Sequence, residues 1–309
     1  MLLEPQTDKA ALDGFRAANP DLFKKDDWLL AAHLGIVLSV LGILTYVVIA
    51  TPYLWLKTVL GALNVLPWFA LINVTIHHHH THRNTALHPW ARRLLDFLYL
   101  IVLPNAPKRL SRYRLAHLNH HAQPFHETDV DHHYGKRRYL AMSKNLWTKF
   151  LYFAELTFVG AHMPGWEDDH YMNNVPLEDW NPADYERVKA VEIKKSRRLS
   201  ALQWTGFGIL VWIFPPAAWG WAFPMLLVKN WAHYLGQFQH YDERFLDPAR
   251  SVWNRTKTYR VPCWLNYFVG GEIAGHFVHH LFPEIPYYRV ETARRRIFAD
   301  PKLASFITY

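Results

Sequence analysis

Apolar residues gather in long stretches that are separated by strongly polar segments. Residues 28–50 contain no formally charged side chain, and residues 53–76 contain only Lys57. Because a bilayer core requires about 20 apolar residues in a helix, each stretch predicts a transmembrane helix. Two further apolar runs share residues 199–238, one on either side of a Pro-Pro pair. The pattern therefore predicts two transmembrane hairpins, 28–76 and 199–238.

The two hairpins divide the chain into five segments. Each hairpin returns the chain to the side of the membrane that it left, so the three polar segments lie on one face. Of the 34 lysines and arginines, 32 lie in these polar segments, and the positive-inside rule places such a face in the cytoplasm. We therefore expect a cytosolic N-terminal segment (1–27), a transmembrane hairpin (28–76), a cytosolic loop (77–198), a second hairpin (199–238) and a cytosolic C-terminal segment (239–309).

These segments predict an all-α membrane protein with four transmembrane helices in two hairpins and a cytosolic helical cap. Within the cytosolic loop, residues 146–165 mix aromatic and aliphatic side chains with charged ones, which is typical of a helix that lies in the membrane interface. The formal net charge of +8 favours contact with anionic lipid headgroups. The chain carries no nucleic-acid-binding motif, so we expect no nucleic-acid partner.

The composition excludes several classes of protein and of metal site. Half of the residues are hydrophobic and only 19% are charged, so the chain is not a disordered tail or linker. Cys263 is the single cysteine, which excludes an intramolecular disulfide, a Cys-ligated iron–sulfur cluster and a Cys-ligated structural zinc site. A metal in this protein must therefore have nitrogen or oxygen ligands.

The chain contains 20 histidines, and many of them collect where the predicted transmembrane helices meet the cytosol. In a helix, residues three or four apart share a face, so each of three short motifs presents several imidazoles together. The first motif is HHHHTH, and the second and third both read H-x-x-H-H. The candidate ligands are His78 and His82, then His117, His120 and His121, then His276, His279 and His280. Three such motifs on one membrane face predict a shared metal site.

This number of nitrogen donors predicts two adjacent metal ions. A zinc ion stops near about four or five ligands and has no redox chemistry, whereas imidazole also suits iron, copper and nickel. Two irons together can reduce O₂ to an oxidant that breaks an unactivated C–H bond, and apolar surroundings suit a lipid substrate. The residues therefore favour a di-iron oxidase of lipids over a zinc protein.

The three motifs resemble the histidine boxes of the membrane-bound fatty acid desaturases and related hydroxylases, which read H-x(3,4)-H, H-x(2,3)-H-H and [HQ]-x(2,3)-H-H. The run HHLFPEIP, which begins with the last two histidines of the third motif, is similar to the sequence at this place in the desaturase branch of the family. Arg114, three residues before the second motif, also resembles that branch. The segment QFQHYDE around His240 resembles the Gln-His segment that supplies a further ligand in that family. The resemblance covers residues 28 to about 290.

The resemblance implies a non-haem di-iron centre with O₂ as co-substrate. Asp129 and Asp131 follow the second motif, and either orient ligand histidines through their second ring nitrogens or lie in a solvated loop. Arg114 is a further candidate for contacts around the ligands. Two alternatives stay open, since His77 also fits the spacing of the first motif and His233 competes with His240. The implied metal ligands are His78, His82, His117, His120, His121, His240, His276, His279 and His280.

The predicted activity is O₂-dependent oxidation of a long-chain lipid, and the HHLFP run favours desaturation of a fatty acyl chain. The alternatives are hydroxylation of an alkane, fatty acid, sphingolipid or carotenoid, and oxidative decarboxylation of a fatty acid to a terminal alkene. A non-enzymatic metal-binding or transport protein is a more remote alternative, because the spans lack paired carboxylates. Electrons require an external donor of the ferredoxin, rubredoxin or cytochrome b5 type. The size, with no fused electron carrier, favours the bacterial inner membrane over the endoplasmic reticulum.

Overall fold

The computed structural model describes the greater part of both ends of the chain and pieces of its middle. The described residues are 6–102, 117–118, 120–122, 124, 145–158, 201–202, 205–206, 208–225, 227–228, 235, 239–240, 242–247, 255–269, 271, 273–305 and 307. Every regular element in these ranges is a helix and none is a strand, which confirms the helical class. Among the predicted features, Arg114, Asp129, Asp131, His233 and residues 159–165 of the expected interfacial helix lie outside the described residues.

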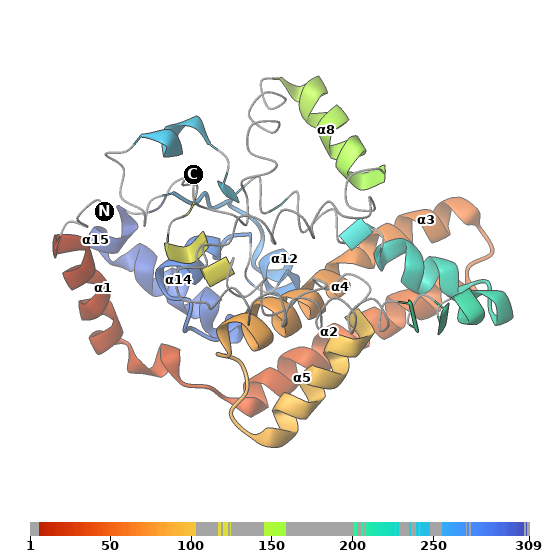
Figure 1. The fold of residues 1–309 in the computed structure, drawn as a ribbon, viewed down its shortest axis with the longest axis horizontal. Helices are drawn as coiled ribbons and strands as arrows, with labels where there is room; N and C mark the ends of the chain where they lie inside the picture. Colours follow the sequence, from red (N-terminus) through yellow and green to blue (C-terminus); the bar gives the residue numbers. More distant parts are fainter. Residues whose placement is uncertain are drawn as a thin grey trace, which may run out of the picture.

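Two long apolar helices run side by side and form the first predicted hairpin (Figure 1). The first is α2 (Asp27–Ala50), and the second runs through α3 (Leu54–Leu63), α4 (Val65–Ile72) and the π-helix η2 (Asn73–His82). Both are long and apolar enough to cross a membrane. The Asp26 side chain accepts hydrogen bonds from two amides of the first turn of α2 and caps that helix. The second helix continues past its predicted end at residue 76 and so carries the first histidine motif.

The second predicted hairpin is described in part, and the described residues contain no third helix long enough to cross a membrane. Its π-helix η5 (Ala218–Ala222) packs against α2 and α3. The Asn64 side-chain amide donates to the backbone carbonyl of Gly220 and to Thr45 Oγ1, each at 3.0 Å. A Cβ atom at Gly220 would lie 2.9 Å from Thr45 Cγ2, so this close approach favours glycine. The four-span topology stays a prediction.

The membrane helices and α5 (Pro89–Val102) share one apolar core. α5 packs along α4 and η2, and the core includes Leu30, Leu34, Val65, Leu71, Leu95 and Leu98. The opposite faces of α2 and α3 expose large apolar side chains, among them Ile36, Ile43, Tyr46, Leu54 and Trp55. Soluble proteins rarely expose apolar patches of this extent, so these faces suit contact with lipid.

Short helices from both ends of the chain form a second core at one end of the long helices (Figure 1). They are α1 (Gln6–Ala18), η1 (Pro20–Phe23), α13 (His276–Leu281), α14 (Val290–Ala299) and α15 (Pro301–Ala304). Between α13 and α14 lies η8 (Tyr287–Arg289), whose Tyr287 belongs to the first core. Phe15 stacks on Phe282 with ring centroids 5.0 Å apart, and the Arg296 guanidinium donates to the Asp21 carboxylate. A further helix, α12 (Cys263–Phe268), packs on α4. This core holds α13, which carries the third motif.

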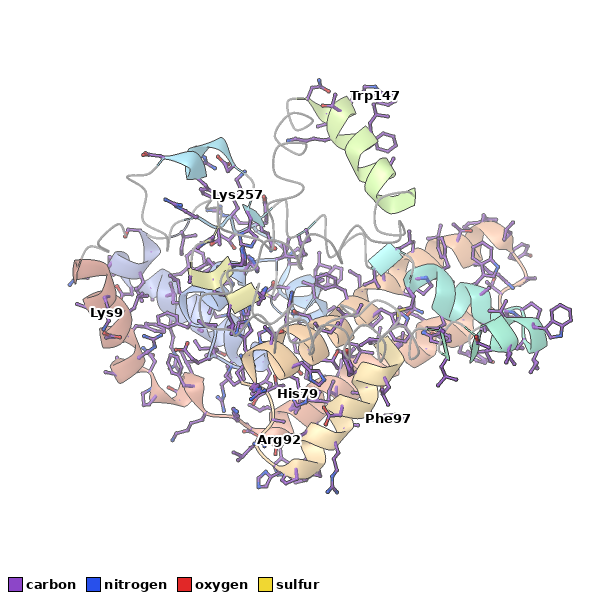
Figure 2. The ribbon with its side chains drawn as sticks, viewed as in Figure 1. Lys9, His79, Arg92, Phe97, Trp147 and Lys257 are labelled. Atoms are coloured by element: carbon purple, nitrogen blue, oxygen red, sulfur yellow. The ribbon has the colours of Figure 1, made fainter. Side chains whose placement is uncertain are left out.

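The expected interfacial helix is described over α8 (Leu146–Phe158), which extends away from the other helices (Figure 2). Its exposed large apolar side chains are Leu146, Trp147, Phe150 and Leu151. The Trp147 and Phe150 rings stack on each other with centroids 5.8 Å apart. An exposed apolar face of this kind suits the membrane interface, and the interfacial location itself stays a prediction.

Candidate metal centre

The first histidine motif lies in the π-helix η2, whose backbone hydrogen bonds join residues five apart. The Thr81 hydroxyl donates at 2.8 Å to the backbone carbonyl five residues earlier and supports this wide turn. The helix ends at His82. Arg83, which follows it, adopts a left-handed backbone with φ 55°, and the Arg83 amide donates to the carbonyl of His78. The wide turn differs from the expected α-helical spacing, and it brings His77, His78 and His82 into contact with the other two motifs.

The first cluster combines histidines from all three motifs: His82, His117, His121 and His279. The Nε2 atom of His121 lies 3.0 Å from that of His117 and 3.1 Å from that of His279. The ring centroid of His82 lies 4.6 Å from that of His279. One nitrogen atom from each residue lies within 4.8 Å of the other three, so this group can hold a metal ion.

The second cluster consists of His120, His240 and His280, with His276 beside them. The Nε2 atom of His240 lies 3.1 Å from that of His120 and 2.6 Å from that of His276. The ring centroid of His280 lies 4.7 Å from those of both His240 and His276. All four side chains are buried, so these imidazoles are shielded from water.

The two clusters adjoin, because the rings of His121 and His280 stack with centroids 4.3 Å apart. Each H-x-x-H-H motif contributes to both. In the second motif the first and last histidines belong to the first cluster and the middle one to the second; in the third motif the assignment is reversed. In a helix, the residue four along is rotated by about 40° around the axis and the residue three along by about 60° in the opposite direction, so these two imidazoles diverge by about 100°. The motif therefore divides its donors between neighbouring sites.

The crowding of nitrogen atoms indicates that each cluster can bind a cation. A neutral imidazole has a single N–H, so Nε2 atoms this close together cannot all be hydrogen-bonded to one another. Nitrogen ligands at right angles on a metal, with bonds of about 2.1 Å, lie about 3.0 Å apart. The observed separations of 2.6–3.1 Å are similar. Both ring nitrogens of His280 are buried with no hydrogen-bond partner among the described residues, which fits a metal-binding role.

The electrostatic surroundings of His121 and His280 lower the pKa of both imidazoles and keep them neutral. Burial lowers the pKa of His280 well below its usual 6.5, and the surrounding imidazoles, first that of His276, lower it further. Burial has the same effect on the pKa of His121, followed by the influence of His280. Histidine binds a metal in its neutral form. The two buried residues are therefore in the state that coordination requires at physiological pH.

His77 and His78 both line the first cluster. The ring of His77 stacks on that of His117 with centroids 4.7 Å apart, and its Nδ1 atom lies 2.9 Å from Asn73 Oδ1. His78 is fully buried, and its ring centroid lies 5.0 Å from that of His279. Either residue can therefore join His82 as the second ligand from the first motif.

Asn84 belongs to no sequence motif, yet it ties the first motif to the third. Its side-chain amide donates to the backbone carbonyls of Pro283 and Ile285, at 2.7 and 3.0 Å, and lies 3.3 Å from His78 Nδ1. Tyr288 makes a similar connection, since its hydroxyl donates to the Thr85 carbonyl. The one sequence signal for Asn84 is that it follows His82 by two residues, which is equally typical of an ordinary helix end.

Replacing Asn84 by alanine is expected to weaken the metal centre. The change leaves two carbonyls without this donor, and an unmade buried hydrogen bond costs about 1–3 kcal/mol of unfolding free energy. We expect a lower thermal transition and faster loss of bound metal to a chelator. Asn145→Ala is the matched control, because Asn145 Oδ1 accepts from the Thr148 amide in α8 and contacts neither cluster. Equal rates of metal loss in the two variants would contradict the connecting role of Asn84.

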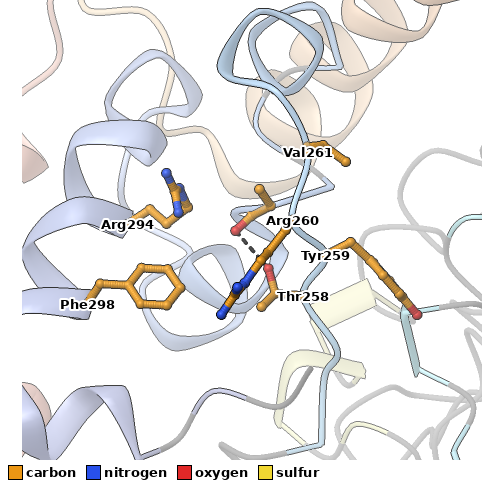
Figure 3. Close-up of a pocket in the computed structure, with 7 residues that line it drawn as sticks. Thr258, Tyr259, Arg260, Val261, Arg294 and Phe298 are labelled. Atoms are coloured by element: carbon orange, nitrogen blue, oxygen red, sulfur yellow. Dashed lines mark hydrogen bonds between the residues drawn. The ribbon is translucent and has the colours of Figure 1, made fainter.

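A separate pocket of about 300 Å³ lies between residues 258–261 and α14 (Figure 3). Its lining contains none of the candidate ligands and consists of Thr258, Tyr259, Arg260, Val261, Ala274, Arg294 and Phe298. The Thr258 hydroxyl donates to the backbone carbonyl of Ala274 at 2.8 Å. Because Ala274 precedes His276 by two residues, this hydrogen bond helps to fix the start of the third motif.

The candidate ligands fall within a region that matches a known family. The family model described as fatty acid desaturase matches residues 53–306, which is most of the chain. This range includes the three histidine motifs, His240 and both clusters. No curated protein matches the chain. From the family match, which the resemblance of the motifs predicted, we conclude that the chain belongs to the fatty acid desaturase family.

Proposed function

We propose that this protein is a membrane-bound oxidoreductase that uses two irons and O₂ to desaturate a long fatty acyl chain. Its family oxidises lipids, which supports the general reaction class. The observation that carries the proposal is the pair of adjoining histidine clusters, since reduction of O₂ by two irons requires two metal sites side by side. Imidazole ligands suit iron.

Each iron would have its own group of ligands. One group is His82, His117, His121 and His279, joined by His77 or His78, and the other is His120, His240, His276 and His280. The bound irons would supply activation of O₂ for removal of hydrogens from adjacent methylene groups. The contribution of the chain is to hold neutral imidazoles in fixed, buried positions and to orient the acyl chain beside them. Asp129, Asp131 and Arg114 are proposed as contacts around these ligands.

We favour desaturation over hydroxylation and oxidative decarboxylation because of the HHLFP run of the third motif. This run has a structural role as well. Leu281 and Phe282 are buried in the second core, and the carbonyl of Pro283 accepts a hydrogen bond from Asn84. The three reactions share the first hydrogen abstraction and differ in how the substrate is placed, so their products distinguish them.

The proposal includes the four-span topology with the metal centre on the cytoplasmic side. The concentration of 32 of the 34 lysines and arginines outside the predicted hairpins supports this orientation. The exposed apolar faces of α2 and α3 support contact with lipid, from which the substrate would enter. An external electron donor of the ferredoxin, rubredoxin or cytochrome b5 type and a bacterial inner membrane complete the proposal.

Metal analysis of the purified protein, together with mass spectrometry of lipids from an expressing host, tests the proposed function. We expect about two irons per chain and lipid products that have lost two hydrogens. Zinc in place of iron would overturn the oxidase proposal. A product that has gained an oxygen atom would overturn desaturation in favour of hydroxylation, and a terminal alkene would do so in favour of decarboxylation.

A further inference from the structure

The run of four histidines contains two side chains that belong to neither cluster. His79 and His80 lie on the side of η2 that faces α5, where they meet Asp96; His79 is labelled in Figure 2, near the start of α5. The Nε2 atom of His79 lies 3.1 Å from Asp96 Oδ1, and that of His80 lies 3.6 Å from the same oxygen. One ligand atom from each of the three residues lies within 4.8 Å of the other two.

The packing of α5 against η2 fixes this third group. The rings of His79 and His80 lie with centroids 4.7 Å apart, and the ring of His80 lies 4.5 Å from that of Tyr99 on α5. Asp96 and Tyr99 are three residues apart and therefore share a face of α5. The arrangement thus depends on two packed helices and not on a loop.

The Asp96 carboxylate lies within hydrogen-bond distance of His79 but not of His80. The Nε2 atom of His80 is buried with no hydrogen-bond partner among the described residues, since 3.6 Å is too long for a hydrogen bond. A buried polar atom without a partner is destabilising. A divalent cation between the three atoms would bind both imidazoles and the carboxylate at once. The Asp96 side chain is 58% exposed, so water can complete the coordination.

Two neighbouring basic side chains, those of Lys25 and Arg92, have hydrogen-bond partners other than Asp96. Lys25 Nζ donates to the backbone carbonyl of Arg83 at 2.6 Å, and the Arg92 guanidinium donates to that of Leu87 at 3.1 Å. Their charge lowers the affinity for a cation, so only an ion with strong preference for imidazole would bind. Two imidazoles and one carboxylate suit Zn²⁺, whereas Mg²⁺ and Ca²⁺ prefer ligand sets made of oxygen.

We propose that His79, His80 and Asp96 form a binding site for Zn²⁺ or a similar divalent cation, separate from the two histidine clusters. An ion bound there joins η2 to α5 and fixes the helix that carries the first motif. The site shares no residue with either cluster, so it does not depend on the identity of the metal in the proposed di-iron centre.

The protein as purified, with its own metal content, is titrated with Zn²⁺ by calorimetry while released iron is measured. We expect a single saturable zinc equivalent, no release of iron, and a higher thermal transition. The variants His80→Ala and Asp96→Asn should each weaken zinc binding by about tenfold or more and should remove the thermal shift. Asp96→Asn keeps the size of an exposed side chain, so the variant retains the fold.

His88→Ala is the matched control for this experiment. The Nδ1 atom of His88 lies 2.6 Å from Asp27 Oδ2, so this residue also belongs to an imidazole–carboxylate pair, but with no second imidazole in the group. Its zinc affinity should equal that of the unchanged protein. Unchanged zinc affinity in His80→Ala and Asp96→Asn, zinc uptake only in exchange for iron, or absence of a saturable zinc equivalent would each overturn the proposed site.

Discussion

Replacing His280 by alanine is expected to abolish lipid oxidation and to remove metal from the second cluster. The His280 ring stacks on that of His121 and contacts those of His120, His240 and His276. Its loss therefore removes a proposed ligand and also the ring contact that joins the two clusters. Removing a residue that only contacts a metal ligand typically lowers metal affinity by about 10–100-fold. Loss of a direct ligand should therefore lower metal affinity by more than that. Iron analysis and lipid profiling measure both outcomes.

His88→Ala is again the matched control, since the His88 side chain is 61% exposed and lies outside both clusters. It should keep its iron and its activity. His280→Ala should still insert into the membrane and unfold in a cooperative transition, which separates ligand loss from misfolding. A variant at His280 that retains the full iron content would contradict the proposed ligand role.

Replacing Gly275 by alanine is expected to disrupt the third motif with the largest loss of stability of any change considered. Gly275 caps the N-terminus of α13, and a Cβ atom there would lie 2.4 Å from Val290 Cγ1 and 2.7 Å from the carbonyl oxygen of Gly271. The second clash is with backbone, so α13 must move and must displace His276 with it. Overpacking typically costs about 1–3 kcal/mol and occasionally more. Thermal unfolding and metal content report the effect.

Gly14→Ala provides the control for this change, because nothing lies within 4 Å of a Cβ atom at Gly14 in α1. Alanine is the better helix former there and should stabilise the protein by about 0.5–1 kcal/mol. Adding Val290→Ala to Gly275→Ala removes the first clash and should restore part of the lost stability. Equal stability of Gly275→Ala and the unchanged protein would contradict the packing of α13 on α14.

Hydropathy predicted the first helix almost completely but ended the second helix too early. The difference at the start of α2 is Asp27, a charged residue that is buried because its carboxylate accepts hydrogen bonds from the amides of Leu87 and His88. The second helix continues to His82 because His77, His78 and His82 contact the other motifs, while His79 and His80 face α5. A hydropathy pattern counts such residues as solvent-exposed, whereas tertiary contacts bury them.

The histidine motifs predicted the family, which the match over residues 53–306 confirms, but not the division of donors between two clusters. Spacing determines which side chains share a helix face. Spacing does not determine which other helix faces each side chain. Those neighbouring helices assign His120 to one cluster and His121 to the other. The contacts of Asn84 and of Asp96 could not be predicted from the sequence either, because each residue joins segments whose relative placement depends on tertiary packing.

The way in which the clusters are divided also determines when they can form during synthesis. The first cluster requires His279, and the second requires His240 and His280, so neither cluster is complete in a nascent chain before the third motif has been synthesised. Stacking of Phe15 on Phe282 joins α1 to the residue that directly follows α13 and its third motif. Binding of metal by a complete ligand set therefore follows synthesis of the third motif.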